Sequence, residues 1–330
     1  MPLGHTRPAG GRRAGVSGLR PAKGKRRTRM ELIPHDINID FVGKRLFFVV
    51  LSCAVNLASI ALLLTWGFNY GVDFVGGTTV EVRFDEPVTA DRIRRDLSEK
   101  GLEDLTIQDI GGERHRFLLR FKEQGEEVGG VGSAVHSALA ASFGESADIV
   151  RVEAVGARVS KALRRKGLLA VTFATLFMGV YIAFRFQPRF GVGAVIALVH
   201  DVLVVIGALV LSQMPMDLSV LAGILTVVGF SVNDTIIISD RIRENMRRFR
   251  RDPLATIINR SINETLSRTI ITSGTSVLVL MALLIFGGHV IKPFAFTLLV
   301  GFTVGVYSSV YIAAPVVLYF EGWGWSRARR

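Results

Sequence analysis

The sequence predicts an α-helical membrane protein, in which a six-helix transmembrane bundle carries one extracytoplasmic α+β domain. Two observations predict this class. Hydrophobic residues make up 49% of the chain and gather in long runs, each of about the 20 residues that a helix needs to cross a bilayer. Between the first and second runs lies a long stretch that alternates like strands. The expected spans are residues 46–66, 167–184, 193–211, 218–239, 269–286 and 294–320.

The basic residues favour a membrane topology over nucleic-acid binding. The formal net charge is +12, and arginine and lysine crowd the segment before the first span, the loop after the fourth and the tail. Cytoplasmic loops carry this excess, so we expect both termini in the cytoplasm. One cluster, Arg164 to Lys166, falls on the outer side, where a long translocated domain weakens the bias. Lipid is therefore the expected environment, and no nucleic-acid partner is expected.

The segments at the two ends of the chain are expected to lie outside the bundle and the extracytoplasmic domain. Residues 1–29 are rich in Gly, Arg and Pro, and we expect a disordered basic extension. Residues 30–66 form a cytoplasmic lead-in and the first span, with Met30 as an alternative start that N-terminal sequencing would test. Residues 321–330 are expected to be a cytoplasmic tail. Cys53 is the single cysteine, which excludes an intrachain disulfide.

Residues 67–166 are expected to form the extracytoplasmic domain. Thr89 is a plausible N-cap for its first helix, and Gly101 follows the end of that helix. Gly76 and Gly77, just before the first strand, predict a tight turn. The expected strands are 78–84, 105–110, 115–121 and 148–155, and the expected helices are 88–100 and 131–143. This βαββαβ order is that of the ferredoxin-like, split βαβ unit.

Residues 167–320 hold spans two to six and a further helix candidate near 253–267. Asp252 and Pro253 are suited to begin that helix, and apolar residues follow on one stripe. An amphipathic helix of this kind can lie flat in the membrane interface or pack under the bundle, and the stripe serves either purpose. Gly301 and Gly305 in span six form a small-xxx-small pair that predicts close helix packing.

Asp234 is a carboxylate inside the fourth span. Placing an Asp near the centre of a membrane helix costs about 2.5 to 3.5 kcal/mol, so such residues usually face the bundle interior and are candidate functional sites. The apolar run 235–238 follows Asp234, so it is not simply the first residue of the loop. Ser231 and Thr235 share its helix face. We therefore expect a polar strip directed at other helices.

Arg268 stands at the inner end of the fifth span, in the same half of the membrane as Asp234. A long arginine stem makes a contact between these two side chains geometrically reasonable. Thr272, Thr275 and Ser276 continue a polar face from Arg268. The alternative is that Arg268 extends to the lipid headgroups while Asp234 caps another group.

His200 and Asp201 lie deeper still, near the midpoint of the third span. Adjacent helical residues project about 100° apart, so we do not expect the two to share a partner. A proton relay and a single structural hydrogen bond would both explain the histidine. The chain has no Walker loop and no HExxH motif, so we expect no enzymatic activity, no cofactor and no metal. Energy for any work must then come from an ion gradient or from partners.

Five stretches together resemble one known family. They are GVDFVGGTTVEVRF after span one, VGARVSKALRRKG before span two, ALVHDVLVV in span three, VVGFSVNDTIIISDRIREN in span four and SINETLSRTIITSGTS entering span five. They closely resemble the SecF family, the smaller membrane subunits of the SecD/SecF protein-export complex. The resemblance runs from about residue 30 to residue 320 with the motifs in order.

The resemblance implies a bundle of the resistance-nodulation-division (RND) type in the bacterial cytoplasmic membrane. It implies SecD as partner, association with the SecYEG channel, YajC and YidC, and contact with a translocating preprotein. In the family, the Asp of NDTI and the Arg of LSRTIITSGT are implicated in proton movement, which here gives Asp234 and Arg268, with Asn233 beside them. The HD pair, His200 and Asp201, also matches the family pattern and is a further candidate for proton movement.

The leading hypothesis is an accessory translocase subunit that, with SecD, couples the proton gradient to late steps of preprotein export. Two alternatives remain open. One is a scaffold that only stabilises SecD and the channel, and the other is half of an RND-type small-molecule exporter. The outer domain shows no evident substrate funnel, which argues against the exporter.

Overall fold

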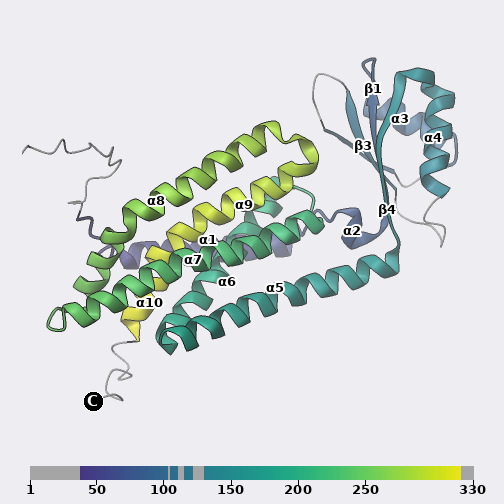
Figure 1. Ribbon diagram of the computed structural model, residues 1–330. Helices are drawn as coiled ribbons and strands as arrows, with labels where there is room; N and C mark the ends of the chain where they lie inside the picture. The colour runs from purple at the N-terminus through teal and green to yellow at the C-terminus, as the bar shows by residue number, and fades with distance from the viewer. Residues whose placement is uncertain (1–37, 103–104, 111–114, 122–129, 321–330) are drawn as a thin grey trace, which may run out of the picture. The chain divides into compact units, whose positions relative to one another are not determined.

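The computed structural model describes residues 38–102, 105–110, 115–121 and 130–320 (Figure 1). The basic extension 1–29, the alternative start Met30 and the tail 321–330 lie outside these residues, so the predictions for them stay predictions.

The βαββαβ domain forms as predicted. Its elements are β1 (Gly77–Phe84), α3 (Ala90–Ser98), β2 (Leu105–Asp109), β3 (Arg116–Phe121), α4 (Gly130–Phe143), a 3-10 turn (Gly144–Ser146) and β4 (Ala147–Val155). The strands pair antiparallel in the order β2-β3-β1-β4, and α3 and α4 cover one face of the sheet (Figure 1). Alternate strand residues such as Val80, Val82 and Phe117 meet helix residues such as Ile93 and Leu139 in one apolar core.

The turn into this domain needs glycine. The short helix α2 (Val72–Val75) ends at Gly76, where φ is +86°, and Gly77 follows with φ +119°. L-residues with a side chain rarely adopt these angles, so the prediction of a tight turn at the glycine pair is confirmed.

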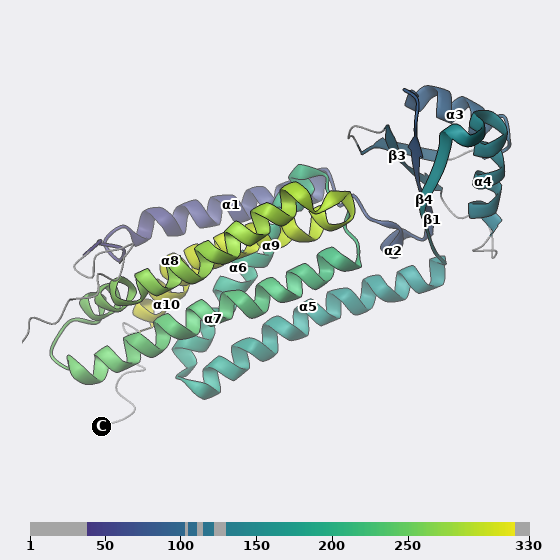
Figure 2. The ribbon, with the colours of Figure 1, turned by 45° about the horizontal axis from the view of Figure 1, so that its top comes forward.

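Six helices in the described part of the chain are long and apolar enough to cross a membrane, which confirms the predicted number of spans (Figure 2). They are α1 (Arg45–Thr65), α5 (Ala157–Arg185), α6 (Pro188–Ser212), α7 (Leu218–Arg248), α8 (Leu254–Phe286) and the run of α9 (Gly288–Ser308), a π-helical turn (Ser309–Ala313) and α10 (Ala314–Tyr319). The chain is therefore a multi-pass membrane protein.

Several helices continue beyond the predicted spans. α5 begins ten residues earlier than the expected span, and α7 continues nine residues past residue 239. The expected separate helix near 253–267 is instead the first part of α8, because no Pro or Gly interrupts 254–273. Its apolar stripe packs into the bundle core: Ile258 and Ile262 are buried beside Ile242 of α7. Of the two alternatives for this stripe, the structure shows packing within the bundle.

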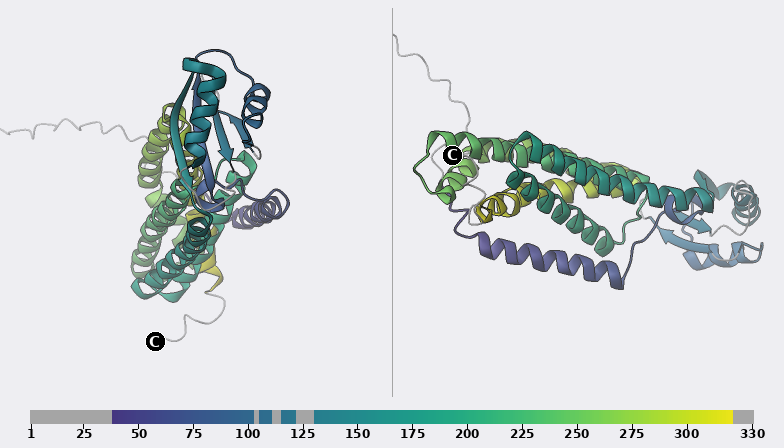
Figure 3. Two further views of the ribbon diagram at one scale, coloured as in Figure 1. Left: turned by 90° about the vertical axis from the view of Figure 1, so that its right-hand side faces the viewer. Right: turned by 90° about the horizontal axis from the view of Figure 1, so that it is seen from below.

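The helices divide into an inner and an outer set. α6, α7 and α9 are the most buried, whereas α1 runs along the outside of the bundle (Figure 3). The inner helices approach closely at glycines: a Cβ at Gly301 of α9 would lie 2.1 Å from a methyl carbon of Val227 in α7. At Gly305 it would lie 3.1 Å from Cβ of Ser231. The predicted close packing at this pair is confirmed, and it brings the polar face of α7 against α9.

Candidate functional site

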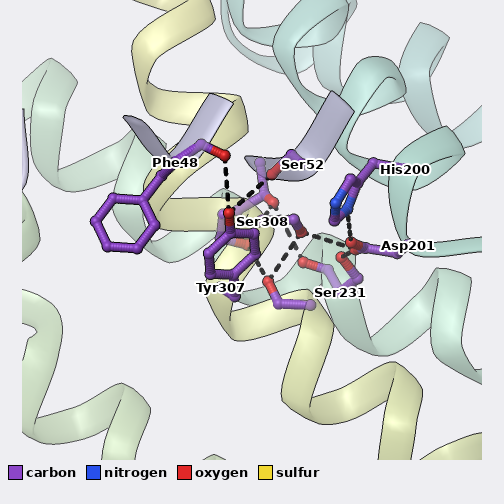
Figure 4. A network of polar contacts seen from close by, with 10 residues as sticks. Phe48, Ser52, His200, Asp201, Ser231, Tyr307 and Ser308 are labelled. Carbon is purple, nitrogen blue, oxygen red and sulfur yellow. Dashed lines mark hydrogen bonds and ion pairs between the residues drawn. The ribbon is translucent and has the colours of Figure 1, made fainter. Parts of the chain in front are cut away.

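Asp201 of α6 is the centre of a polar network in the bundle core (Figure 4). Its side chain is 0% exposed. Oδ1 lies 3.0 Å from Nδ1 of His200, and Oδ2 accepts hydrogen bonds from the hydroxyls of Ser231 at 2.5 Å and Ser308 at 2.8 Å. These donors come from α6, α7 and α9. The Asp201 carboxylate thus joins three helices through three hydrogen bonds.

The network continues toward α1 through Tyr307. Its hydroxyl lies 2.8 Å from that of Ser52 and donates to the carbonyl of Phe48 at 2.9 Å, and its ring centroid is 6.0 Å from that of His200 (Figure 4). A parallel link joins α7 to the π-helical turn, where the hydroxyls of Thr235 and Ser309 lie 2.9 Å apart. Nearly every polar group here has a partner, as buried polar groups require.

Asp234 lies one helical turn from Ser231 on α7 and is equally buried, with 1% of its side chain exposed. Ser231, Asp234 and Thr235 are all buried, so the predicted polar strip does face other helices. Among the described residues, Asp234 accepts one side-chain hydrogen bond, from the hydroxyl of Ser273 of α8 at 3.3 Å. Asp234 is thus a buried carboxylate with far fewer partners than Asp201.

Arg268 does not contact Asp234 in this structure. Within the described ranges the two form no ion pair, and Arg268 is exposed at the rim of a cavity that Thr265 and Asp240 also line. The predicted contact is therefore not made in this state. Arg268 lines this cavity with Ile237 and Asp240 of α7, so it lies beside α7 without reaching Asp234. It stands five residues before Ser273, the α8 residue that does reach Asp234.

The polar face predicted for α8 is exposed and does not reach Asp234. Thr272 and Thr275 are exposed, and their hydroxyls donate to carbonyls of their own helix, at Arg268 and Ile271. The residue that reaches Asp234 is Ser273, which the sequence reasoning missed. A serine next to a threonine gives no sign of which of the two faces inward.

Asn233 is exposed and lies outside the buried network. It shares the outer face of α7 with Thr226 and Gly229, which are also exposed. The structure therefore does not bring Asn233 together with the two buried aspartates.

His200 and Asp201 contact each other, which the expectation that they do not share a partner did not consider. The imidazole folds back so that Nδ1 reaches the neighbouring carboxylate directly. Sequence reasoning also missed Tyr307, Ser308 and Ser52. The adjacent pair of serines in span six was a usable signal, since two hydroxyls in an apolar run are most readily satisfied by a polar neighbour on another helix.

The chemistry that this site offers comes from two buried carboxyl groups, Asp201 and Asp234. Among the residues that the structure describes, no group of three His, Cys, Asp or Glu side chains could hold a metal ion. What the site offers is two buried carboxyl groups on neighbouring helices, one with three hydrogen-bond donors and one with a single hydroxyl.

Comparison with known proteins identifies the family. The profile described as "Protein export membrane protein SecD/SecF, C-terminal" matches residues 135–323, and that of the "SecD/SecF GG Motif" matches residues 61–88. The protein translocase subunit SecF of Desulfurispirillum indicum is 42% identical over 86% of this chain and 92% of its own length. The chain belongs to the SecF family. The SecF proteins of Magnetococcus marinus and Escherichia coli O157:H7 are 43% and 39% identical over 88% and 81% of this chain, covering 95% and 83% of their own lengths.

A solved structure confirms the fold class. The crystal structure of SecDF from Thermus thermophilus, a translocon-associated membrane protein, matches 88% of this chain with a TM-score of 0.79 and 34% identity. A second SecDF structure, in a super-membrane-facing form, matches the same share with a TM-score of 0.66. This SecF-family chain spans 40% of each of those longer chains. The RND-type bundle with a ferredoxin-like domain is thus supported by both sequence and structure.

Proposed function

We propose that this chain is an accessory subunit of the Sec protein translocase that acts with SecD to couple proton movement to late steps of preprotein export. The proposal depends on one observation, the burial of the Asp234 carboxyl group with few hydrogen-bond partners. Its carboxyl group is 1% exposed inside the bundle and has a single hydroxyl donor among the described residues. Intramembrane carboxyl groups are expensive and mark proton pathways in pumps and transporters.

The mechanism needs only a change in the surroundings of Asp234. Beside a guanidinium a buried carboxyl group is stable as the anion, and beside a lone hydroxyl it is stable as the acid. Arg268 lies one and a half turns along α8 from Ser273, so a rotation or shift of α8 against α7 would exchange one neighbour for the other. Each exchange would take up or release one proton. A proton that crosses the whole membrane supplies about 2.3 kcal/mol per 100 mV of membrane potential.

The outer face of α7 supports SecD as the partner. Thr226, Gly229 and Asn233 form an exposed stripe of small and polar residues, and Thr272 and Thr275 are exposed on neighbouring α8. Such residues favour close helix packing and interhelical hydrogen bonds over lipid contact. We place the SecD subunit on this face, where Asn233 would join the coupling site. The solved SecDF chains are longer than this one and extend beyond the part that it matches.

The topology and the remaining partners follow from the family and the charge pattern. We propose that both ends of the chain lie in the cytoplasm, and the basic loop between α7 and α8 supports this through the positive-inside rule. SecYEG, YajC and YidC are proposed as further partners in the bacterial cytoplasmic membrane, with a preprotein as the transported substrate.

Asp201 and His200 are assigned a structural role within this proposal. Three donors fill the carboxylate, and the network ties α6, α7 and α9 together. A filled network of this kind rigidifies a core. The pair would hold α7 in place while α8 moves.

Replacement of Asp234 by Asn tests the proposal, because the amide keeps the shape and removes the titratable group. We expect Asp234→Asn to assemble with SecD at normal levels, measured by co-purification and membrane blot, and to lose the proton-dependent part of preprotein export in inverted membrane vesicles. Asp85→Asn, the same change at an exposed carboxylate of the βαββαβ domain, is the matched control. Normal proton-driven export by assembled Asp234→Asn would overturn the coupling role. A defect that follows only reduced protein levels would indicate the scaffold instead, and altered drug susceptibility would favour the exporter.

A further inference from the structure

A basic cavity opens where α5 and α7 end. Its volume is about 550 Å³. The cavity is lined by Arg185, Asp240, Arg243, Glu244, Arg247 and Arg248. Arg185 is the last residue of α5, and the other arginines lie on the last two turns of α7. The cavity therefore lies at the end of the bundle that the positive-inside rule assigns to the cytoplasm.

A second cavity of about 450 Å³ adjoins the first, sharing Arg185, Asp240 and Glu244 with it. This one has an apolar wall, made by Tyr181, Phe186, Ile236 and Ile237. Together the two cavities present six arginines against two carboxylates. The combined site is thus strongly positive at one side and apolar at the other.

Most of this positive charge is uncompensated. Arg241 is occupied, since it donates to Glu264 and to Glu244 at 2.6 Å each. By contrast, Arg185, Arg243, Arg247 and Arg248 form no ion pair with any carboxylate in the described part of the chain. The guanidiniums of Arg185 and Arg248 lie over the rings of Phe186 and Phe249, at 5.2 and 5.3 Å. Stacking of this kind leaves the edge N–H donors available for a phosphate, which arginine binds in a bidentate manner.

An aromatic rail leads from this cavity along α5 toward the membrane interior. Phe173, Phe177, Tyr181 and Arg185 follow at intervals of four residues, so they lie on one side of the helix. All four are exposed, and the rings of Phe173 and Phe177 stack at 5.7 Å. The rail is about 18 Å long at 1.5 Å per residue. One leaflet of hydrocarbon is about 15 Å thick, so the rail has the length of an acyl chain in one leaflet.

We propose that this site binds an anionic glycerophospholipid, with the phosphate held by Arg185, Arg243 and Arg247 and an acyl chain lying on the aromatic rail. Basic pockets between membrane helices on the cytoplasmic side bind anionic headgroups. A free phosphate compound shares the headgroup chemistry, but it would make no use of the rail. The lipid is therefore the occupant that accounts for both halves of the site.

Native mass spectrometry of the purified full chain tests the proposal, using phosphatidylglycerol and phosphatidylcholine with identical acyl chains. Wild type should retain phosphatidylglycerol preferentially. Arg185→Gln/Arg247→Gln should lower that preference about tenfold or more, because each interfacial arginine contributes strongly to binding an anionic lipid. Arg250→Gln/Arg251→Gln is the matched control, since it removes the same charge from two exposed arginines nearby that do not line the cavities. Equal retention of the two lipids by wild type, or equal losses in both variants, would overturn the proposal.

A variant that is expected to bind more lipid distinguishes a specific change in the site from misfolding, because a misfolded chain would bind less. Asp240 lines both cavities and, among the described residues, has no ion pair, so Asp240→Asn should raise retention of phosphatidylglycerol. Inorganic phosphate and pyrophosphate are added as competitors to test whether the site binds a soluble phosphate compound. If either displaces the lipid at low millimolar concentration, the site is one for a soluble phosphate and the lipid proposal fails. A photo-crosslinker in place of Arg243 that captures an acidic protein segment instead of lipid in membranes would also overturn it.

Discussion

Asp201 and Asp234 are two carboxylates of the same bundle that are equally buried and differently supported. Asp201 receives two serine hydroxyls and lies against its own histidine neighbour. Asp234 receives one serine hydroxyl, at the longer distance of 3.3 Å. Burial alone therefore does not distinguish the two carboxylates. The number of hydrogen-bond donors that each has in this structure does.

The difference has a physical basis in the low-dielectric interior. A carboxylate with a full set of donors is stabilised as it stands, and moving any helix that supplies a donor exposes an unsatisfied group. A carboxylate with one donor loses little when its neighbour moves. Asp201 is thus suited to fix α6, α7 and α9, whereas Asp234 is suited to respond to α8.

The largest expected effect on stability is that of Asp201→Ala. It leaves the hydroxyls of Ser231 and Ser308 and the imidazole of His200 without their acceptor, and each unsatisfied buried donor costs about 1 to 3 kcal/mol. Asp234→Ala frees only the hydroxyl of Ser273. Thermal unfolding of the full chain in detergent should therefore show a much lower midpoint for Asp201→Ala than for Asp234→Ala. Equal midpoints would remove the distinction drawn between the two carboxylates.

An intermediate effect is expected from Gly301→Ala. The added Cβ would lie 2.1 Å from Val227 of α7 and would push α9, with Ser308, away from α7. Overpacking of this kind typically costs about 1 to 3 kcal/mol. Gly274→Ala on α8 is the control, because an added Cβ there meets nothing within 4 Å. A lower unfolding midpoint for Gly301→Ala, with export by the surviving fraction still proton-dependent, would show that the α7 and α9 contact supports Asp201 and not Asp234.

The spans, the outer domain and the buried aspartates could be predicted from sequence because each depends on a local property. Twenty apolar residues must cross the membrane as a helix, alternation must form strands, and a carboxylate in an apolar run must face inward. The strip of Ser231, Asp234 and Thr235 was predicted in this way. The tight turn at the glycine pair before β1 was also predicted, because the positive φ of both residues strongly favours glycine.

The partners of the aspartates could not be predicted, because they depend on how each neighbouring helix is rotated. An error of one residue turns a helix by about 100°, which is the difference between Thr272 and Ser273. The continuity of α8 was missed for another reason: a stripe of apolar residues is the same whether it lies on lipid or on α7. Ser308 reaches Asp201 from 107 residues away, a contact that no local pattern reveals.

The smallest expected effect is that of Ser273→Ala, and it examines the exchange at Asp234 most directly. The change removes the one hydroxyl that reaches Asp234 and leaves the Asp201 network untouched. A single hydrogen bond contributes about 1 kcal/mol, so we expect an almost unchanged unfolding midpoint and a change of a few-fold in proton-driven export. Ser276→Ala, on the same helix with its hydroxyl bonded to Thr272, is the matched control. If Ser273→Ala and Ser276→Ala behave alike in vesicles, the hydroxyl does not stabilise any state of Asp234 on the export cycle. If only Ser273→Ala changes export, its dependence on external pH should shift as well, because the acid and the anion of Asp234 lose a hydrogen bond of different strength.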